Sequence, residues 1–531
     1  MNELEKDNLL IICPNEQKIN ILDELSKTNK LYNIKFMTKE EYKKNYYYSY
    51  DESALYYLMN KYNYNLAVAK VYMNNLYVIE TDKNYSSSKL IFLQNLKKEL
   101  IENNLLKFNQ SFNKYLSTKN IIVKNYYDLD KYEEEMLNYK LNIPKKKLTT
   151  PVVECNTLEE EVNYVCLKII ELLNKGIDIN KIYLTNISDD YYYTINKLFS
   201  YYKIPINLDI KTSIYSTKVV KDYLTNDILD LENKDKSLIN RKLVNIIASL
   251  SKIDNTTKEY KTLLIDKLKN TNISSKKKKN AVNIKNLYNQ TFSNDEYVFV
   301  LGFNQDALPK MEKDIAFIND EIKGEVNLYT TNDLNKRNKE VVEYILSSID
   351  NLYLSYKLSS PFSSFYKSSL IGDLNLEIIK PEEDLYKNSN LYNKLRLAEK
   401  LDLFYLYGEK EKYLDNLLST YKIPYKTYSN KFTGINNDLY LEKLPYPLKL
   451  SYTSINTYNE CKFKYYIRNV LKLEPYTETF ASYIGSMYHK ILSLYQYPNF
   501  DFEKEYQKYI SEHELTLKEK ILLIKIKKDL N

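Results

Sequence analysis

Glycine is scarce in this sequence, and its spacing excludes two nucleotide-binding motifs. Only 7 of the 531 residues are glycine, and the closest two are Gly302 and Gly324. Neither G-x-x-x-x-G-K-[ST] nor G-x-G-x-x-G fits such spacing, and both motifs need glycine so that backbone N–H groups can approach phosphate. The apolar run Leu9–Cys13 and the amphipathic segment after it predict a strand, a turn and a helix, the place where a nucleotide-binding α/β domain carries its phosphate loop. No glycine lies between Cys13 and Leu22, so we expect no ATP cofactor.

Cysteines and long apolar runs are also few. The cysteines form no C-x-x-C pair and no disulfide-framework spacing, which favours a reduced, intracellular compartment; they are Cys13, Cys155, Cys166 and Cys461. No apolar stretch approaches the roughly 18 residues that span a bilayer. The first residues, MNELEKDNLLIICPNEQ, carry acids and an apolar run too short for a signal peptide. We therefore expect a cytoplasmic protein with no membrane partner.

Tryptophan is absent, whereas tyrosine occurs 56 times. Codons rich in A and T supply Lys, Asn, Ile and Tyr, so we attribute the skew to the genome. The net charge of +7 is spread over the chain, and basic surfaces attract phosphate backbones only where they cluster. The clearest cluster, SSKKKKN at 274–280, is interpreted as a solvated loop. The tyrosine runs at 46–50 and 188–194 have rings that can stack on single-stranded bases, but composition alone accounts for such runs.

The length and the alternation of patterns predict an α/β protein of several domains. Residues 1–145 form the first, with a helical insertion, and the prolines and lysines of 141–155 mark a linker. In the second, 150–375, Thr157 caps a helix with Glu160 at the capping-box spacing, Gly176 ends that helix, and a polar helical insertion lies at about 210–280. A helical connector at 376–447 precedes the last unit, 448–531.

Three sets of segments together resemble one family. VFVLGFNQDALPK, DIAFINDEIKG and LYLSYKLSS resemble the second RecA-like domain of UvrD-type helicases, as found in helicase/nuclease proteins of the AddB type. EEEVNYVCLKIIELLNKGIDINKIYL and YYYTINKLFSYYKIPINL resemble the start of that domain. LSYTSINTYNECKFKYYIRNVLKL and YIGSMYHKIL resemble the opening of the RecB-like PD-(D/E)XK nuclease of these proteins. The order and the spacing agree from about residue 80 to residue 495.

The resemblance implies degenerate RecA-like domains at 1–145 and 150–375, without ATPase activity, and the N-terminal part of a nuclease domain at 448–531. It also implies a role in the repair of DNA double-strand breaks, with DNA and an AddA-like helicase/nuclease as partners. Lys462 stands where the nuclease motif of the family usually has proline.

His489 is the candidate metal ligand. On a helix starting near Ile484, an apolar stripe runs through 484, 487, 488, 491, 494 and 495, and His489 lies outside it, one turn after Gly485. Periodicity alone favours a solvent-facing histidine, but we expect Gly485 to leave room for a ring that faces a cleft. The resemblance implies that this histidine contacts the catalytic Mg²⁺ or Mn²⁺.

The carboxylates that such a metal ion requires do not follow His489 in the expected pattern. Mg²⁺ and Mn²⁺ are held mainly by carboxylate oxygens, which the family supplies from an Asp and a (D/E)-x-K motif. None of the acids after His489 has a lysine two positions later; they are Asp501, Glu503, Glu505, Glu512, Glu514, Glu519 and Asp529. We therefore expect no complete catalytic site in this chain.

Cys461 is a weaker candidate. The resemblance implies the first of four iron–sulfur ligands, whereas the alternative is a small buried residue between Tyr458 and Tyr465 on one helix face. No cysteine follows it in this chain, so an iron–sulfur cluster would need further cysteines.

Two functions remain open at this point. The first is an AddB-like subunit that holds DNA while a partner helicase moves it and that contributes a metal-dependent nuclease. The second is a DNA-binding or partner-docking scaffold without catalysis. An unrelated α/β scaffold is a third possibility.

Overall fold

The structure, a computed structural model, divides into two compact units. Unit 1 comprises Met1–Lys400 and Glu411–Ile423, and unit 2 comprises Leu401–Lys410 and Pro424–Asn531. The structure describes residues 8–27, 30–208, 211–226, 237–273, 277–361, 363–381, 385–426, 438, 441–442, 444, 447–473, 480–498, 500–511, 519, 522–523 and 526–527.

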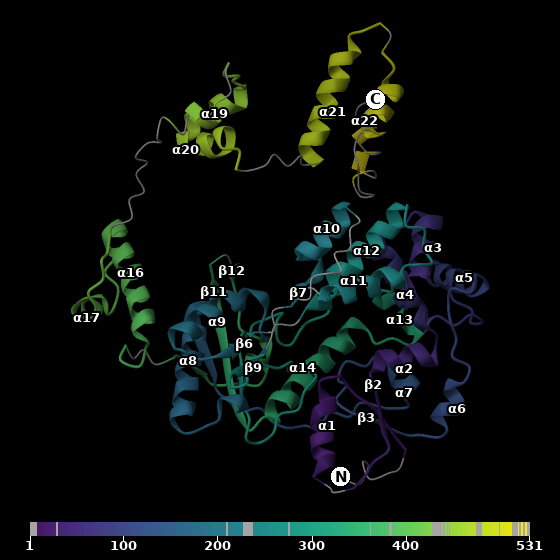
Figure 1. Cartoon of the computed structure of the whole chain (residues 1–531), viewed down its shortest axis with the longest axis horizontal. Coiled ribbons are helices and arrows are strands. Elements are labelled where there is room, and N and C mark those ends of the chain that lie inside the picture. Colours follow the sequence, from purple (N-terminus) through teal and green to yellow (C-terminus); the bar gives the residue numbers. More distant parts are fainter. Residues whose placement is uncertain are drawn as a thin grey trace. The chain divides into compact units, whose positions relative to one another are not determined.

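The N-terminal part of unit 1 is built on a three-stranded parallel sheet in the order β2-β1-β3 (Figure 1). The strands are β1 (Leu9–Ile12), β2 (Ile34–Met37) and β3 (Asn120–Val123). All of β1 is buried, because helices cover both faces of this central strand. Leu9 and Ile11 pack on α1 (Gln17–Ser26), while Leu10 and Ile12 pack on the opposite layer. That layer consists of α2 (Lys39–Tyr46), α6 (Phe112–Leu116) and α7 (Lys131–Leu137). The strand expected at the start of the chain is confirmed.

A larger, mostly parallel sheet follows, with β10 (Tyr297–Val300) and β11 (Asn351–Ser360) near its centre. Among the described residues it has eight strands in the order β13-β4-β11-β10-β5-β9-β6, and β12 pairs antiparallel with β11. The other strands are β4 (Val152–Thr157), β5 (Ile182–Thr185), β6 (Ile206–Asn207), β9 (Val282–Ile284), β12 (Ser363–Ser364) and β13 (Ile378–Ile379).

Alternate residues of β10 face different helical layers. Phe299 points to the layer of α8 (Leu158–Asn174) and α9 (Asp189–Tyr201). Val298 and Val300 point to the layer of α14 (Thr331–Ser347) and α15 (Ser369–Asp373). Both faces of the strand are therefore buried, as its uninterrupted apolar run requires. The predicted α/β class is confirmed for unit 1.

The Thr157 cap and the helix end at Gly176 are also confirmed for α8, whereas the second bond of the capping box is not formed at Thr157. Thr157 Oγ1 accepts a 3.1 Å hydrogen bond from the backbone N–H of Glu160. The Glu160 carboxylate accepts from the backbone N–H of Asn156 at 2.5 Å, one residue before the position that the capping-box spacing predicts. Gly176 follows the helix with φ of +82°, a conformation that glycine adopts without steric cost.

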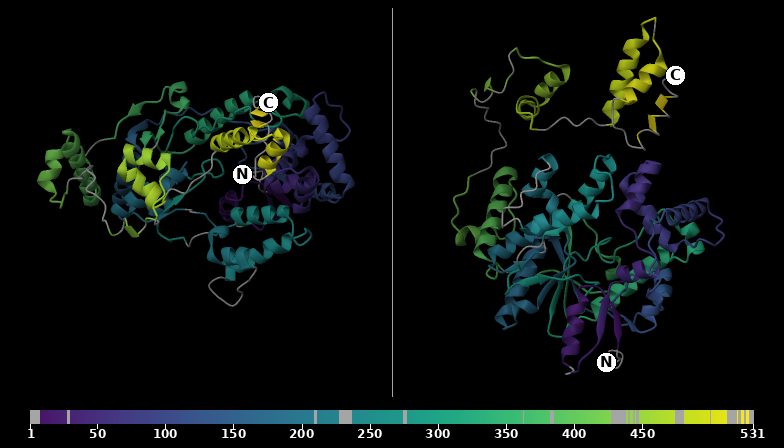
Figure 2. Two further views of the ribbon diagram at one scale, coloured as in Figure 1. Left: turned by 90° about the horizontal axis from the view of Figure 1, so that it is seen from above. Right: turned by 45° about the vertical axis from the view of Figure 1, so that its right-hand side comes forward.

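Helices from two distant parts of the sequence share one core (Figure 1, Figure 2). One set is α3 (Glu52–Tyr62), α4 (Leu66–Asn75) and α5 (Ser88–Glu102); the other is α10 (Lys218–Asn226), α11 (Ser237–Ser249) and α12 (Lys258–Asn270). Lys70 pairs with Asp266 at 2.7 Å, and Glu52 pairs with Lys267 at 2.6 Å. The expected insertion at about 210–280 is thus helical, and it packs on helices of segment 1–145, because an amphipathic helix needs a partner for its apolar face.

The remaining elements of unit 1 include the pair β7 (Thr212–Ser213) and β8 (Asn272–Ile273), and the short helix α13 (Asp320–Lys323). The connector expected at 376–447 contains α16 (Asn390–Tyr407) and α17 (Leu414–Thr420). The nuclease-like segment of unit 2 contains α19 (Tyr452–Glu460), α20 (Lys462–Tyr465), the π-helix η7 (Tyr466–Val470), α21 (Phe480–Tyr495) and α22 (Phe502–Ser511). In the part of the chain that the structure describes, every helix is too short or too polar to cross a bilayer.

Candidate nuclease site

The first helix of the nuclease-like segment begins at a reciprocal cap. Ser451 Oγ accepts from the backbone N–H of Ser454 at 3.1 Å, and the backbone N–H of Ser451 donates to Ser454 Oγ at 2.9 Å. The backbone becomes extended at Cys461, with φ of −159°, which ends α19. The next helix, α20, begins one residue later at Lys462, so α19 and α20 are two separate helices.

Cys461 lies between these two helices and is exposed. Its Sγ accepts from the backbone N–H of Lys464 at 3.4 Å and so caps α20. The alternative expectation of a buried cysteine on one helix face is therefore wrong, because the extended residue lies between the two helices and is exposed. Tyr458 and Tyr465 contact each other instead, with ring centroids 5.4 Å apart.

Lys462 holds the first position of α20. A proline is well tolerated there, because the first N–H of a helix has no partner within that helix. The proline that the family usually carries would thus suit this backbone, and lysine preserves the same helix start. Its Nζ lies 5.7 Å from the ring centroid of Tyr458.

α21 begins at Phe480, four residues before the expected start, and His489 lies in its second half. The buried residues of the helix are Tyr483, Met487 and Ile491. The apolar stripe is thus shifted from the predicted one, since Tyr495 is 73% exposed. His489 is exposed and lies outside the stripe, as predicted.

The space around Gly485 differs from the expectation. A methyl group placed on Gly485 would have no atom within 4 Å. The glycine therefore does not relieve crowding against the ring of His489, and the expected role of Gly485 is wrong. The helix presents an open surface one turn before the histidine.

The buried face of α21 packs on α22 and on Leu523. The ring centroids of Tyr483 and Tyr509 are 5.1 Å apart, and the Tyr483 hydroxyl donates to the backbone oxygen of Tyr509 at 3.3 Å. The Tyr506 hydroxyl donates to the backbone oxygen of Leu523 at 2.8 Å. This small core fixes the exposed face of α21, and with it the side on which His489 stands.

The acids after His489 do not form a metal site in the described residues. Within those residues no group of three or more His, Cys, Asp or Glu side chains could hold a metal ion. Glu503, in the polar helix α22, pairs with Lys527 at 2.7 Å, and its pKa is lowered by the hydrogen bond from Lys527. Glu512, Glu514 and Asp529 lie outside the described residues. One imidazole and no converging carboxylates do not fit a hard cation such as Mg²⁺, so we derive no catalytic step from these residues.

The tyrosine runs do not provide continuous stacking surfaces. Tyr48 is buried against Tyr77, with ring centroids 4.7 Å apart, and Tyr191 is also buried. Tyr46 and Tyr193 are exposed, because successive residues of a helix point in different directions. Of the lysine cluster, residues 274–276 lie outside the described part, and Lys277, Lys278 and Lys279 are exposed.

Sequence reasoning missed a buried polar cluster at the carboxyl edge of the larger sheet. The carboxylate of Glu161 is fully buried and accepts from the backbone N–H of Gly302 at 2.8 Å, from Ser355 Oγ at 2.7 Å and from the Tyr191 hydroxyl at 2.5 Å. Burial raises the pKa of Glu161, and these donors oppose that effect. Beside it, Lys357 Nζ lies 3.7 Å from the ring centroid of Tyr191.

The cluster ties the start of α8 to the ends of β10 and β11. Lys357 is 3% exposed and pairs with Asp190 at 2.6 Å. Every polar group named here has a partner, so the arrangement is structural. A sequence signal existed: Glu161 falls on the apolar stripe of α8, next to Val162 and one turn before Val165, where a carboxylate is unexpected.

Comparison with known protein families gives a match for the C-terminal segment. Residues 449–521 match the family model of the PD-(D/E)XK nuclease superfamily. A search of curated protein sequences finds no significant match to the chain. PD-(D/E)XK nucleases generally depend on a divalent metal ion. The segment that carries Cys461, Lys462 and His489 is thus a PD-(D/E)XK nuclease superfamily domain.

Proposed function

We propose that this chain is an AddB-like subunit of a helicase/nuclease that processes DNA double-strand breaks, and that residues 449–521 contribute to its metal-dependent nuclease. The observation that carries the proposal is the PD-(D/E)XK match over a segment in which His489 is exposed on α21. An exposed imidazole opposite a packed face is accessible to a metal ion and to a phosphate group.

In this proposal His489 supplies one ligand, and carboxylates from outside the described residues complete the site. A divalent ion held at the completed site would supply a Lewis acid for phosphodiester hydrolysis. An iron–sulfur cluster is not required, since Cys461 already caps α20.

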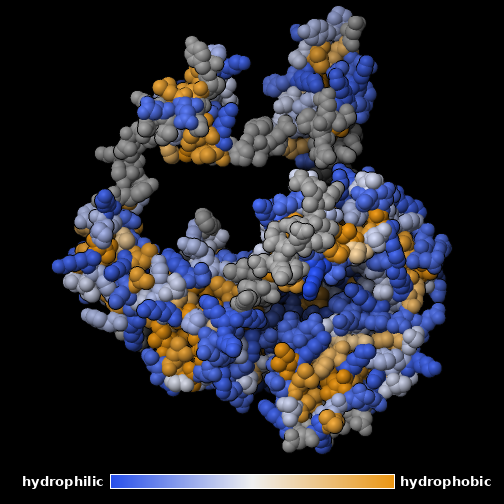
Figure 3. Space-filling model, in the orientation of Figure 1, coloured by the Kyte–Doolittle hydropathy of each residue, from blue (hydrophilic) through white to orange (hydrophobic). Residues whose placement is uncertain are grey.

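Unit 1 would hold DNA while an AddA-like partner moves it. Its parallel sheets and the resemblance of segment 150–375 to a RecA-like domain support this role. The turn between β1 and α1 has no glycine with which to cradle a triphosphate. Polar residues cover most of the face shown in Figure 3, with apolar patches between them, so the proposal assigns DNA contacts to no single cluster.

The alternative is a scaffold that binds DNA or a partner without catalysis. It is favoured by the lack of converging carboxylates around His489 in the described residues. The two proposals differ in whether the exposed face of α21 meets DNA.

The two histidines of the chain, His489 and His513, make this difference measurable. Protein labelled with ¹³C at histidine gives one imidazole signal from each, and His489→Gln assigns them. With a DNA duplex bearing a single-stranded tail, the nuclease proposal expects the His489 signal to shift, and Mn²⁺ to broaden it further. Ser493→Ala, on the same exposed face, is the matched control and should keep both responses.

DNA binding measured by anisotropy, together with an unchanged His489 signal, would favour the scaffold. Absence of salt-sensitive DNA binding would contradict the nuclease proposal and leave only a scaffold that docks a partner, because phosphate contacts release counterions and weaken as salt rises.

A further inference from the structure

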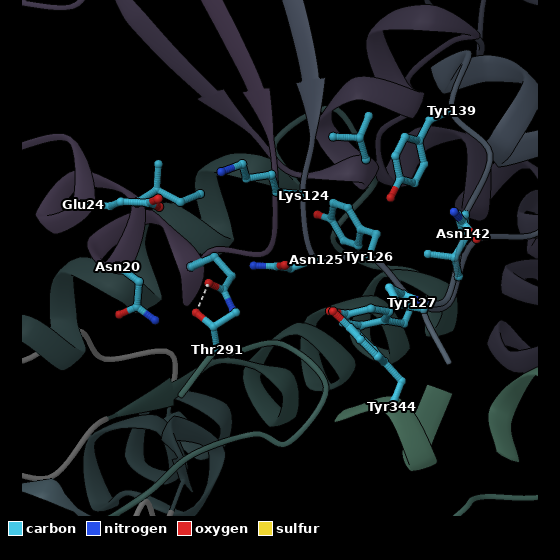
Figure 4. Close-up of a pocket in the computed structure, with 15 residues that line it drawn as sticks. Asn20, Glu24, Lys124, Asn125, Tyr126, Tyr127, Tyr139, Asn142, Thr291 and Tyr344 are labelled. Atoms are coloured by element: carbon cyan, nitrogen blue, oxygen red, sulfur yellow. Dashed lines mark hydrogen bonds between the residues drawn. The ribbon is translucent and has the colours of Figure 1, made fainter. Parts of the chain in front are cut away.

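A pocket of 370 Å³ lies at the carboxyl ends of β1 and β3 (Figure 4). Its walls come from α1, from residues 123–127 that end and follow β3, from residues 139–144, and from Thr291 and Tyr344. In the order β2-β1-β3 the chain leaves β1 for β2 on one side and then crosses to β3 on the other. Open parallel sheets bind ligands at such a switch point, and the volume falls within the range of about 300 to 1,000 Å³ for small-molecule sites.

The helix beside this pocket, α1, begins with a buried polar residue. Gln17, the first residue of α1, is 1% exposed. Its Nε2 donates to the backbone oxygen of Asn289 at 2.8 Å, and its Oε1 accepts from Thr291 Oγ1 at 3.4 Å. The side chain thus joins the start of α1 to residues 289 and 291. The turn before α1 also lacks the glycines of a phosphate loop, which favours a ligand without a polyphosphate.

The remaining walls suit a flat, uncharged, polar molecule. Carboxamides of Asn20, Asn125 and Asn142 border the pocket, and each offers both a donor and an acceptor. Tyr127 and Tyr344 provide a pair of rings with centroids 6.2 Å apart. Aromatic faces stack on nucleobases of any sequence, and amide groups read their edges.

The charges of the lining balance. Lys124 and Glu24 are its two charged side chains, one of each sign. In Figure 4 they lie on the same side of the pocket, away from Tyr127 and Tyr344. The lining therefore gives no excess of positive charge for an anion.

We propose that this pocket binds a nucleobase, either as a free nucleoside or as an unpaired base of a DNA strand. The proposal rests on residues of unit 1 alone and is independent of the nuclease proposed for unit 2. Binding is expected without hydrolysis, because the lining contains no glycine-rich phosphate loop.

Isothermal titration of the whole chain with adenosine, guanosine, cytidine and thymidine tests the proposal. At least one nucleoside should bind saturably, and ATP should bind no more tightly than the nucleoside. Asn20→Trp fills the pocket from α1 and should weaken binding at least about tenfold. Asp23→Trp, on the same helix but outside the lining, is the matched control and should bind as the unchanged chain does.

A second filling variant, Asn142→Trp, fills the pocket from another wall. It tests the proposal independently if Asn20→Trp does not fold. A single-stranded oligonucleotide that competes with the nucleoside in the control, and that binds more weakly to Asn20→Trp than to the control, would support the pocket with DNA as the source of the base. Nucleoside binding without competition would support it with a free nucleoside as the source. Three results would overturn the proposal. They are no saturable binding of any nucleoside, nucleoside binding by both filling variants as tight as by the unchanged chain, and binding of ATP at least about tenfold tighter than binding of adenosine.

Discussion

The carboxylate of Glu161 accepts a 2.8 Å hydrogen bond from the backbone N–H of Gly302, which is 141 positions away in the chain. Through this bond the start of α8 holds the loop that follows β10. Glu161→Leu leaves the N–H of Gly302 and the hydroxyls of Ser355 and Tyr191 without this acceptor. We expect a loss of about 3–5 kcal/mol in the free energy of unfolding, measured by urea denaturation.

Ser355→Ala removes a single donor and should cost only about 1–2 kcal/mol. The double variant should lose less than the sum of the two, because the residues share one network. Strict additivity would show that the cluster does not act as a unit.

Arg337 joins the two sheets of unit 1 through α7. Its Nη1 donates to the backbone oxygen of Leu129 at 2.7 Å, and its Nη2 lies 3.0 Å from Glu134 Oε1. Both side chains are mostly buried, so Arg337→Ala leaves a poorly solvated carboxylate. We expect a loss of about 2–3 kcal/mol in stability, with little recovery in Arg337→Lys, because lysine lacks the planar fork.

Lys339→Ala, two residues along the same helix α14, is the control for Arg337. Its pair with Asp373, at 2.7 Å, is more exposed and should contribute at most about 1 kcal/mol. A cost at Arg337 no larger than the cost at Lys339 would show that the contact between α14 and α7 does not stabilise unit 1.

Lys97 should make stability depend on pH in the alkaline range. Burial lowers its pKa from 10.5 to about 8, although its Nζ donates to the backbone oxygens of Leu76 and Ile79. Between these two values the unfolded chain binds more protons than the folded one, so the stability of the wild type rises with pH relative to Lys97→Met. The gain is about 1.4 kcal/mol for each unit by which the two pKa values differ.

Urea midpoints of both proteins at pH 7, 8, 9 and 10 measure this difference. A constant difference across the series would show that the Lys97 ammonium titrates as it does in the unfolded chain.

One of the four cysteines should react with a thiol reagent in the native chain, and the other three should not. Cys461 is exposed, whereas Cys13, Cys155 and Cys166 are buried. Burial also raises the pKa of Cys13 to about 11 and the pKa values of Cys155 and Cys166 further. Since the thiolate is the reactive species, maleimide should label the native chain once, and Cys461→Ser should abolish the labelling. Labelling at two or more sites in that variant would contradict the burial described for unit 1.

Much of the fold could be predicted from the sequence where a single segment carries the signal. The strand at Leu9, the Thr157 cap and the helix end at Gly176 depend on near neighbours, and all three are confirmed. Glu161 was missed because its donors, Gly302 in the loop after β10 and Ser355 in β11, lie far along the chain. The shared core of α3–α5 and α10–α12 was missed for the same reason.

The candidate site shows the same limit. Periodicity placed His489 outside the apolar stripe of α21 correctly, but it did not find the break at Cys461. Because the backbone of Cys461 is extended, this cysteine is an exposed cap of α20 and not a buried residue within a helix. The pocket beside α1 has no sequence motif, because its walls come from five separate parts of the sequence.

The central proposal is that His489 is one ligand of a nuclease metal site whose carboxylates do not come from the described residues of the segment 449–531. The most direct test is metal-dependent cutting of labelled single- and double-stranded DNA by the chain 1–531 with Mn²⁺ or Mg²⁺, beside His489→Ala. We predict no cutting by either protein, together with salt-sensitive retention of DNA by both. Metal-dependent cutting by the unchanged chain that is lost in His489→Ala would contradict the claim, because it would mean that a complete site exists within these residues.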